Sequence, residues 1–179
     1  MSDHLNNLID DFNDRSFIYT DLCSSSSSYY SKCKYIFSIP VILVSSILSI
    51  LNSNIVDEKQ MKLLNISCNV LIALLMSLTN LFKFAEKQQS FKIWSAKFTE
   101  LNHSLQTQIS LEESISKEYI LNFIEKYDNI VSSMDFEIPE HIKKKIHDKY
   151  KTKKTLPIII NGVEKSPENR IRIRLTTLT

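Results

Sequence analysis

The sequence predicts an all-α membrane protein, with a two-span transmembrane helical hairpin, a cytoplasmic helical module after it, and a short extended or disordered C-terminal tail. Three observations support this prediction. Residues 35–56 and 63–82 carry no charged side chain, six residues connect the two runs, and the 179-residue chain contains one glycine. Scarce glycine favours uninterrupted helices. It also excludes the glycine-rich phosphate loops and nucleophile elbows on which many enzymes depend.

The two uncharged runs are long enough to cross a bilayer. At a helical rise of 1.5 Å per residue, each spans roughly 30 Å, which matches the thickness of the hydrocarbon core. We expect spans at about 35–55 and 63–82, which make domain 35–82 a tight antiparallel hairpin. The alternative is a pair of buried helices in a soluble bundle. Such helices normally carry a charged stripe, and neither run has one.

Lysines flank the predicted hairpin on the side of both chain ends. Two lysines precede the first span and four follow the second: Lys32, Lys34, Lys83, Lys87, Lys92 and Lys97. Because an excess of Lys and Arg marks the cytoplasmic side, we expect an integral membrane protein with both termini in the cytoplasm. Lys59 and Lys62 in the connecting loop weaken this argument without reversing it. The acidic N-terminus lacks the early apolar core of a cleaved signal sequence.

The segments at the two ends of the chain differ in composition from the middle. Residues 1–34 form a polar N-terminal segment that ends in the serine run Ser24–Ser28, which we interpret as a flexible linker. Residues 152–179 form a basic tail. Its Asn161-Gly162 pair is a hairpin signal, but the strand after it would be very short, so we expect an extended or disordered tail.

The cytoplasmic helical module covers residues 83–151. We expect the second span to continue as a helix from Lys83 to Gln108, with an apolar seam at heptad spacing: Phe84, Phe91, Trp94, Phe98, Leu101 and Leu105. Such a seam packs either in the core of the module or against another subunit. A capping-box pattern at Ser110 predicts a new helix from Leu111. Pro139 occupies a plausible first helical position before Ile142, Ile146 and Tyr150.

Polar residues recur along one face of each predicted span. The candidate pore-lining or helix-interface residues are Ser45, Ser49 and Asn52 in the first span and Asn65, Asn69, Ser77 and Asn80 in the second. A polar stripe that faced lipid would leave amides and hydroxyls without partners. These faces must therefore meet each other, another subunit or water. Packing that holds the hairpin together and an aqueous pore in an oligomer are both open at this point.

The remaining chemistry-bearing residues form no recognisable site. The four histidines and three cysteines show no metal-ligand spacing, so we predict surface histidines, no metal site, no cofactor and no enzymatic activity. The basic segment from Lys143 to Lys154 belongs to no nucleic-acid-reading motif, and no nucleic-acid partner is expected. It either attracts anionic lipid headgroups or is a solvated helix face.

The layout resembles the SLATT family, the two-transmembrane effector domains associated with nucleotide-signalling (SMODS and SLOG) conflict systems. The similarity covers about Tyr29 to Lys151. It rests on AEKQQSFKIWSAKFTELNHSL, where the fitting positions are Ala85, Glu86, Ala96, Phe98 and Leu101, and on IPEHIKKKIHDKY. Gln88, Gln89 and Ser90 stand where a histidine is common in the family. The resemblance implies a membrane effector that oligomerises and permeabilises membranes, gated by cytoplasmic partners.

Two functions follow as hypotheses. The first is an oligomeric, pore-forming, SLATT-like effector whose partners are the lipid bilayer, further copies of the chain and a cytoplasmic protein. The second is a structural or tethering membrane protein, for example a viral envelope component or an organelle scaffold, that binds its partner through the cytoplasmic module.

Overall fold

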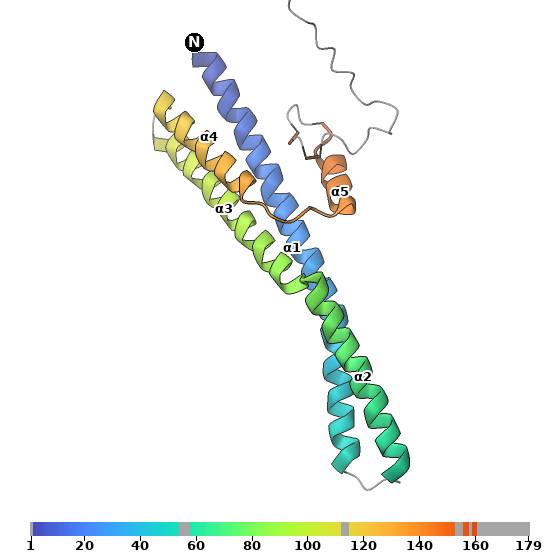
Figure 1. Ribbon diagram of the computed structural model, residues 1–179. Coiled ribbons are helices and arrows are strands. Elements are labelled where there is room, and N and C mark those ends of the chain that lie inside the picture. The colour runs from blue at the N-terminus through green and yellow to red at the C-terminus, as the bar shows by residue number, and fades with distance from the viewer. Residues whose placement is uncertain (1, 54–57, 112–114, 153–155, 158, 161–179) are drawn as a thin grey trace, which may run out of the picture.

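The computed structural model describes residues 2–53, 58–111, 115–152, 156, 157, 159 and 160. These residues form five α-helices and no strand, so the prediction of an all-helical fold is confirmed for the described part of the chain. The predicted hairpin signal at Asn161-Gly162 and nearly all of the predicted tail lie outside the described residues. Figure 1 shows an elongated molecule with a narrow two-helix stalk and a broader helical head.

Helix α1 (Ser2–Ser53) is a single helix of 52 residues. At 1.5 Å per residue it is about 78 Å long and runs through both the head and the stalk. The linker predicted at Ser24–Ser28 is wrong, because these residues are helical and Ser26 is fully buried. Packing against a second helix outweighs the modest helix propensity of serine. Pro40 is accommodated inside the helix, although it removes one backbone hydrogen bond.

Two helices lie antiparallel to α1, one beside each half of it. Helix α2 (Glu58–Phe82) accompanies the C-terminal half, and α3 (Phe84–Leu111) accompanies the N-terminal half. The predicted continuity between them is interrupted at Lys83, whose φ of 52° lies in the left-handed region. This conformation costs a non-glycine residue roughly 1–2 kcal/mol. The Lys83 N–H still donates to the Asn80 carbonyl at 3.2 Å.

Two shorter helices complete the head. Helix α4 (Lys117–Ser132) contacts α3 and α1, and α5 (Glu140–Tyr150) contacts α1. The helix predicted to start at Leu111 begins six residues later, because the Ser116 hydroxyl, and not Ser110, accepts the capping hydrogen bond from the Tyr119 N–H at 3.1 Å. Pro139 is the N-cap of α5 and not its first helical residue.

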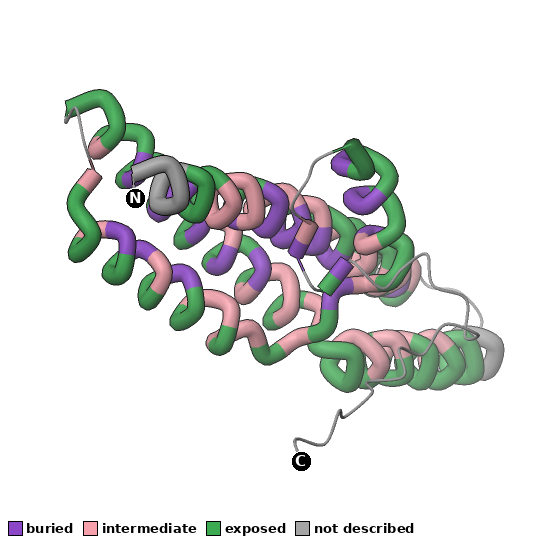
Figure 2. Tube along the Cα trace, turned by 90° about the horizontal axis from the view of Figure 1, so that it is seen from above, coloured by how far each residue is buried: buried purple, intermediate pink, exposed green. Residues whose placement is uncertain are grey.

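The apolar core lies almost entirely in the head. We use "stalk" for residues 35–53 and 58–82 and "head" for residues 7–34, 84–111 and 115–152. Every cluster of buried apolar side chains that the structure describes joins α1 to α3, α4 and α5 within the head. In the stalk, Leu48 is the one buried hydrophobic residue among those described. Figure 2 shows the corresponding buried stripes on the facing sides of the head helices.

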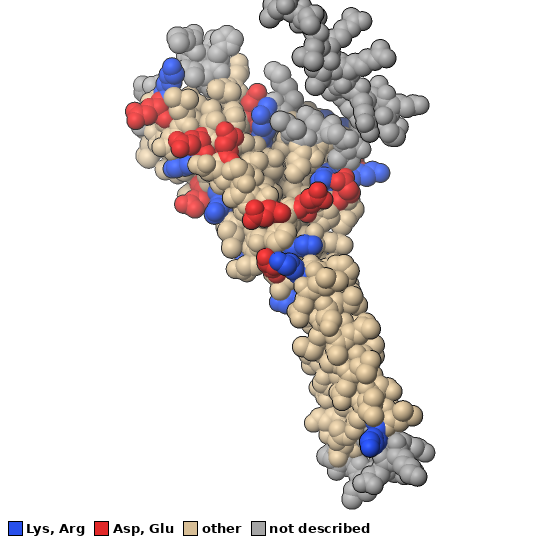
Figure 3. Space-filling view, in the orientation of Figure 1, with Lys and Arg blue, Asp and Glu red and all other residues tan. Residues whose placement is uncertain are grey.

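The stalk exposes apolar side chains where a water-soluble protein would expose polar ones. Two helices are long and apolar enough to cross a membrane, with 18-residue windows of mean hydropathy 2.0 and 1.6. A core helix of a soluble protein can match this length and composition, but it is mostly buried, whereas 6% and 0% of these windows are buried. Figure 3 shows the charged side chains gathered on the head, with an almost uncharged stalk below.

Candidate functional site: the polar edge of the stalk

A cavity of about 400 Å³ opens between α1 and α2 near the far end of the stalk. Five polar residues that the sequence singles out line it, and we call them the polar edge: Ser45, Ser49, Asn52, Asn65 and Asn69. The serines and Asn52 are spaced by four and three residues on α1, and the two remaining asparagines by four on α2. This spacing places each set on one helix face. Leu48 and Ile72 supply the apolar floor.

One hydrogen bond joins the two helices across the polar edge. The Asn65 Nδ2 donates to the Asn52 Oδ1 at 2.7 Å. The Asn65 Oδ1 is buried and has no hydrogen-bond partner. An unsatisfied buried acceptor costs about 1–3 kcal/mol, and the penalty grows where the surroundings are apolar. The Asn65 amide is therefore only partly satisfied by its hydrogen bond to Asn52.

The other predicted polar residues of the second span lie outside this cavity. The Ser77 hydroxyl donates to the Ala73 carbonyl at 2.8 Å, so its hydrogen-bonding capacity is used within its own helix. Asn80 lies near the head, where its carbonyl accepts the Lys83 N–H. The structure thus brings together five of the seven candidate residues, and it separates Ser77 and Asn80 from them.

The polar edge is not covered within one copy of the chain. Ser45, Ser49, Asn52 and Asn69 are exposed, and Asn65 is half-buried. Among the apolar residues of α1 in the stalk, Leu48 is buried at 7% exposure and Val44 is half-buried. Packing of the hairpin therefore leaves these side chains available to a second copy or to water.

The aromatic seam is buried inside the head of the same chain. Of its six residues, Phe91, Trp94, Phe98, Leu101 and Leu105 are at most 5% exposed, and Phe84 is partly buried against the core. Phe91 stacks on Tyr30 with ring centroids 5.6 Å apart, and Phe98 stacks on Tyr19 at 5.1 Å. Of the two alternatives open from the sequence, core and subunit interface, these contacts favour the core.

The aromatic seam packs against the N-terminal half of α1. The sequence did not predict this partner, because it lies in residues 1–34, which were interpreted as a polar segment ending in a linker. Ile18, Leu22, Ser26 and Tyr30 recur every four residues along α1 and are buried against the other head helices. This spacing is a helical signal. The small serines between the apolar residues concealed it.

The sequence also gave no indication that Asp21 on α1 joins two helices of the head. Asp21 accepts hydrogen bonds of 2.5 Å from the Lys149 Nζ and from the Tyr150 hydroxyl at the end of α5. Partial burial by itself would raise the pKa of Asp21, but the two hydrogen bonds and the Lys149 charge outweigh it and hold that pKa below its ordinary value. The carboxylate fastens α5 to α1.

The described part of the chain offers no cluster of three metal-binding side chains. Burial raises the pKa of the Cys23 thiol to about 12, so this cysteine is poorly suited to nucleophilic chemistry at neutral pH.

His147 is 7% exposed, and the prediction that all histidines lie on the surface is wrong for this residue. It lies beside Ile146 and Tyr150 on the buried face of α5.

Comparison with protein-family models, with curated proteins and with solved structures returned no match. The class of molecule that the fold defines is a helical protein with two helices capable of spanning a membrane and a separately packed helical head.

Proposed function

We propose that the protein is a two-span integral membrane protein whose stalks associate through the polar edge and line a pore, in the manner of a SLATT-like effector. The membrane part of this proposal rests on the exposed apolar surface of the stalk. Many large apolar residues there are exposed over about half or more of their surface, including Ile36 at 67%, Ile42 at 62% and Leu63 at 69%. Soluble monomers rarely expose a continuous apolar surface of this extent.

The orientation proposed for the chain follows from charge and from where the described chain ends lie. The N-terminus of α1 and the described residues after α5 lie at the head end of the molecule (Figure 1). Lys32 and Lys34 flank the stalk on that side, which favours a cytoplasmic head. The opposite end of the stalk would then reach the other membrane surface.

One observation supports association through the polar edge: polar side chains from both helices gather around one cavity, on a stalk whose large exposed side chains are mostly apolar. Facing lipid, the side chains of Ser45, Ser49 and Asn69 would lack partners outside their own helix, and the buried Asn65 Oδ1 lacks one already. Several copies arranged with their polar edges inward would place the groups against each other and against water. The head would then be the element through which a cytoplasmic partner gates the assembly.

Conductance of the full chain in planar bilayers tests this proposal. We expect channel events from the wild type and lower conductance from Asn69→Leu, which removes a polar group from the lumen. Ser67→Leu is the matched control, since this exposed serine lies two residues away on another face of α2. Cross-linked mass in detergent shows whether each variant still oligomerises.

A folded oligomer without conductance would contradict the pore. It would favour the alternative function of a membrane tether, and capture of one stoichiometric partner by the head would then identify that role. A monomeric wild type in detergent and in bilayers would contradict association through the polar edge.

A further inference from the structure

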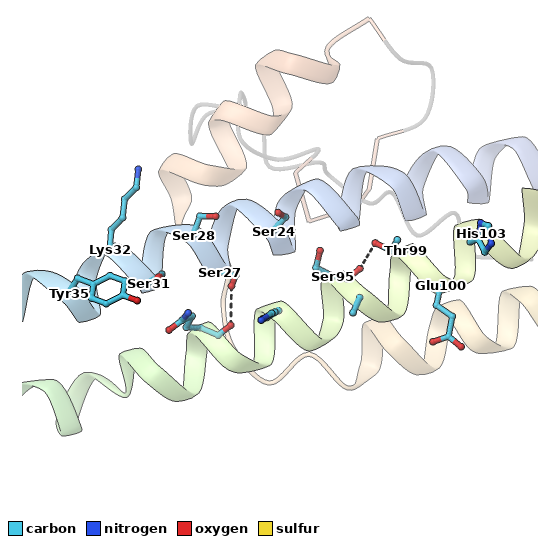
Figure 4. A pocket seen from close by; sticks show the side chains of 13 residues that line it. Ser24, Ser27, Ser28, Ser31, Lys32, Tyr35, Ser95, Thr99, Glu100 and His103 are labelled. Carbon is cyan, nitrogen blue, oxygen red and sulfur yellow. Dashed lines mark hydrogen bonds between the residues drawn. The ribbon is translucent and has the colours of Figure 1, made fainter. Parts of the chain in front are cut away.

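A second hollow lies on the head, directly above the stalk. It is a groove of about 900 Å³ between α1 and α3 (Figure 4). Its end nearest the stalk is lined from both helices by Ser28, Ser31, Lys32, Tyr35, Gln88 and Lys92. The linker between α4 and α5 crosses the opposite face of this helix pair, so the groove is open (Figures 1 and 4).

The stalk end of the groove is positively charged and rich in unused hydrogen-bond donors. Lys32 and Lys92 are exposed and form no ion pair within the described residues, and the hydroxyls of Ser28 and Ser31 make no hydrogen bond there. By contrast, the Ser27 hydroxyl is already bound to the Gln88 carbonyl at 3.1 Å. Lys32 and Lys92 supply one ammonium group from each helix of the groove, and ammonium and hydroxyl groups both donate hydrogen bonds to phosphate oxygens.

The one acidic residue of the groove is too distant to neutralise these lysines. Glu100 lies eight residues beyond Lys92 on α3, which corresponds to about 12 Å along the helix. This separation exceeds the Debye length of about 8 Å at physiological ionic strength. The positive potential is therefore concentrated at the end of the groove that meets the stalk.

The groove continues into the apolar surface of the stalk. Tyr35 is the first residue of the uncharged run and is 56% exposed. Ile39 and Ile42 follow it at four and seven residues, on the same face of α1, and are 50% and 62% exposed. Tyrosine is enriched where the hydrocarbon core meets the headgroups. A ligand here would meet cationic and hydroxyl groups at one end and apolar side chains at the other.

We propose that this groove binds the headgroup phosphate of an anionic phospholipid, whose acyl chains lie along Ile39 and Ile42. The proposal rests on the membrane insertion described above, but it needs neither a pore nor an oligomer. It assigns a specific lipid class to the leaflet that faces the head. It also places a ligand against α1 and α3 where these helices enter the membrane.

Native mass spectrometry of the full chain in mild detergent, supplied with equal amounts of phosphatidylglycerol and phosphatidylcholine, tests the assignment. We expect the wild type to retain phosphatidylglycerol preferentially. The double variant Lys32→Gln/Lys92→Gln should lower this retention about 25-fold, because each of the two lysines near a headgroup contributes about a fivefold increase in affinity. Lys32→Arg/Lys92→Arg should preserve it. The matched control is Lys97→Gln/Lys126→Gln, which removes two exposed lysines elsewhere on the head.

Three results would overturn the proposal. They are equal retention of the two lipids by the wild type, unchanged retention by the glutamine variant, and displacement of the lipid by millimolar inorganic phosphate, which would assign the groove to a soluble anion. Carbonate extraction from membranes is measured in parallel. A chain that is released by carbonate fails the proposed function as well, whereas a retained chain without lipid preference fails only this inference.

Discussion

Two serines that lie two residues apart, and therefore on different faces of α1, show how position, and not residue type, decides a side chain's role. Ser26 is fully buried between α1 and the other head helices, and its hydroxyl has no hydrogen-bond partner. Ser24 is exposed and lines the groove. At the buried position the value of serine is its small size, since it allows the helix backbones to approach closely. The unpaired hydroxyl of Ser26 lowers the stability of the folded head.

Substitutions at these serines separate a packed helix from a flexible linker. Ser26→Leu should lower the free energy of unfolding of the head by about 1–3 kcal/mol through overpacking. Ser26→Ala should leave it unchanged or raise it by about 1 kcal/mol, because an unpaired buried hydroxyl is removed. Urea unfolding followed by fluorescence of Trp94, the single tryptophan, measures both. Ser24→Leu is the control and should stay within about 0.5 kcal/mol. Equal tolerance of leucine at both positions would contradict the packing.

At the scale of elements, the helices differ in how firmly each is attached. Helix α3 is fastened to α1 along its whole length by the aromatic seam and by side-chain bonds such as Ser95 Oγ to the Thr20 carbonyl at 3.2 Å. Helix α5 is short and makes its polar attachment to α1 at its C-terminal end, through Asp21. Helices α2 and α3 meet at Lys83, whose left-handed backbone sets the angle between stalk and head.

The attachment of α5 should depend on pH in a defined direction. The pKa of Asp21 is lower in the folded chain than its unfolded value of about 3.9. The stabilisation is therefore complete above the unfolded pKa and is lost as pH falls through the folded pKa. Asp21→Asn should weaken α5 docking by about 1 kcal/mol at neutral pH and abolish the acid-dependent release. Hydrogen exchange of residues 140–150 measures this docking.

Glu140→Gln provides the comparison for Asp21→Asn. Glu140 pairs with Lys143 within the same helix, and its side chain is 78% exposed while that of Lys143 is 16% exposed. This pair does not join α5 to α1, so the variant should leave the docking of α5 nearly unchanged. Acid release that persisted in Asp21→Asn would show that another group controls the docking.

At the scale of the whole molecule, the head buries its own apolar surface and the stalk does not. The head core spans four helices, whereas most large apolar side chains of the stalk face outward. The head can therefore fold against water, while the stalk needs a bilayer or further copies to cover it. This division predicts that the two parts respond separately to core mutations.

Phe98→Ala should unfold the head selectively. Phe98 is fully buried and stacks on Tyr19, so the cavity left behind should cost about 3–5 kcal/mol of head stability. Urea unfolding followed by Trp94 fluorescence reports the loss, while protease protection of the stalk in vesicles should persist. Ile93→Ala, at a residue of the same helix that is 44% exposed, is the control with an effect of less than about 0.5 kcal/mol. Simultaneous loss of stalk protection would contradict the separation.

Much of the fold could be predicted from local patterns in the sequence. The uncharged runs, the helical spacing of the aromatic seam and the apolar residues of α5 are each readable within a few turns of one helix. Helix boundaries were less predictable. Ser110 and Ser116 both offer a capping hydroxyl, and the structure uses the second. Likewise, no sequence signal marks the left-handed residue at Lys83, where glycine would be expected.

By itself, the sequence determined that the chain is helical and that two segments have the length and composition of membrane spans. It also determined that a row of aromatic and leucine side chains is more stable when buried. The tertiary structure decided which surfaces meet. It paired the seam with Tyr19 and Tyr30, joined Asn52 to Asn65, and brought Ser27 against the Gln88 carbonyl across 61 residues. Hydropathy and helical period are properties of neighbours in the chain. The choice of partner depends on how side-chain shapes fit between helices far apart in sequence, and no local pattern encodes that fit.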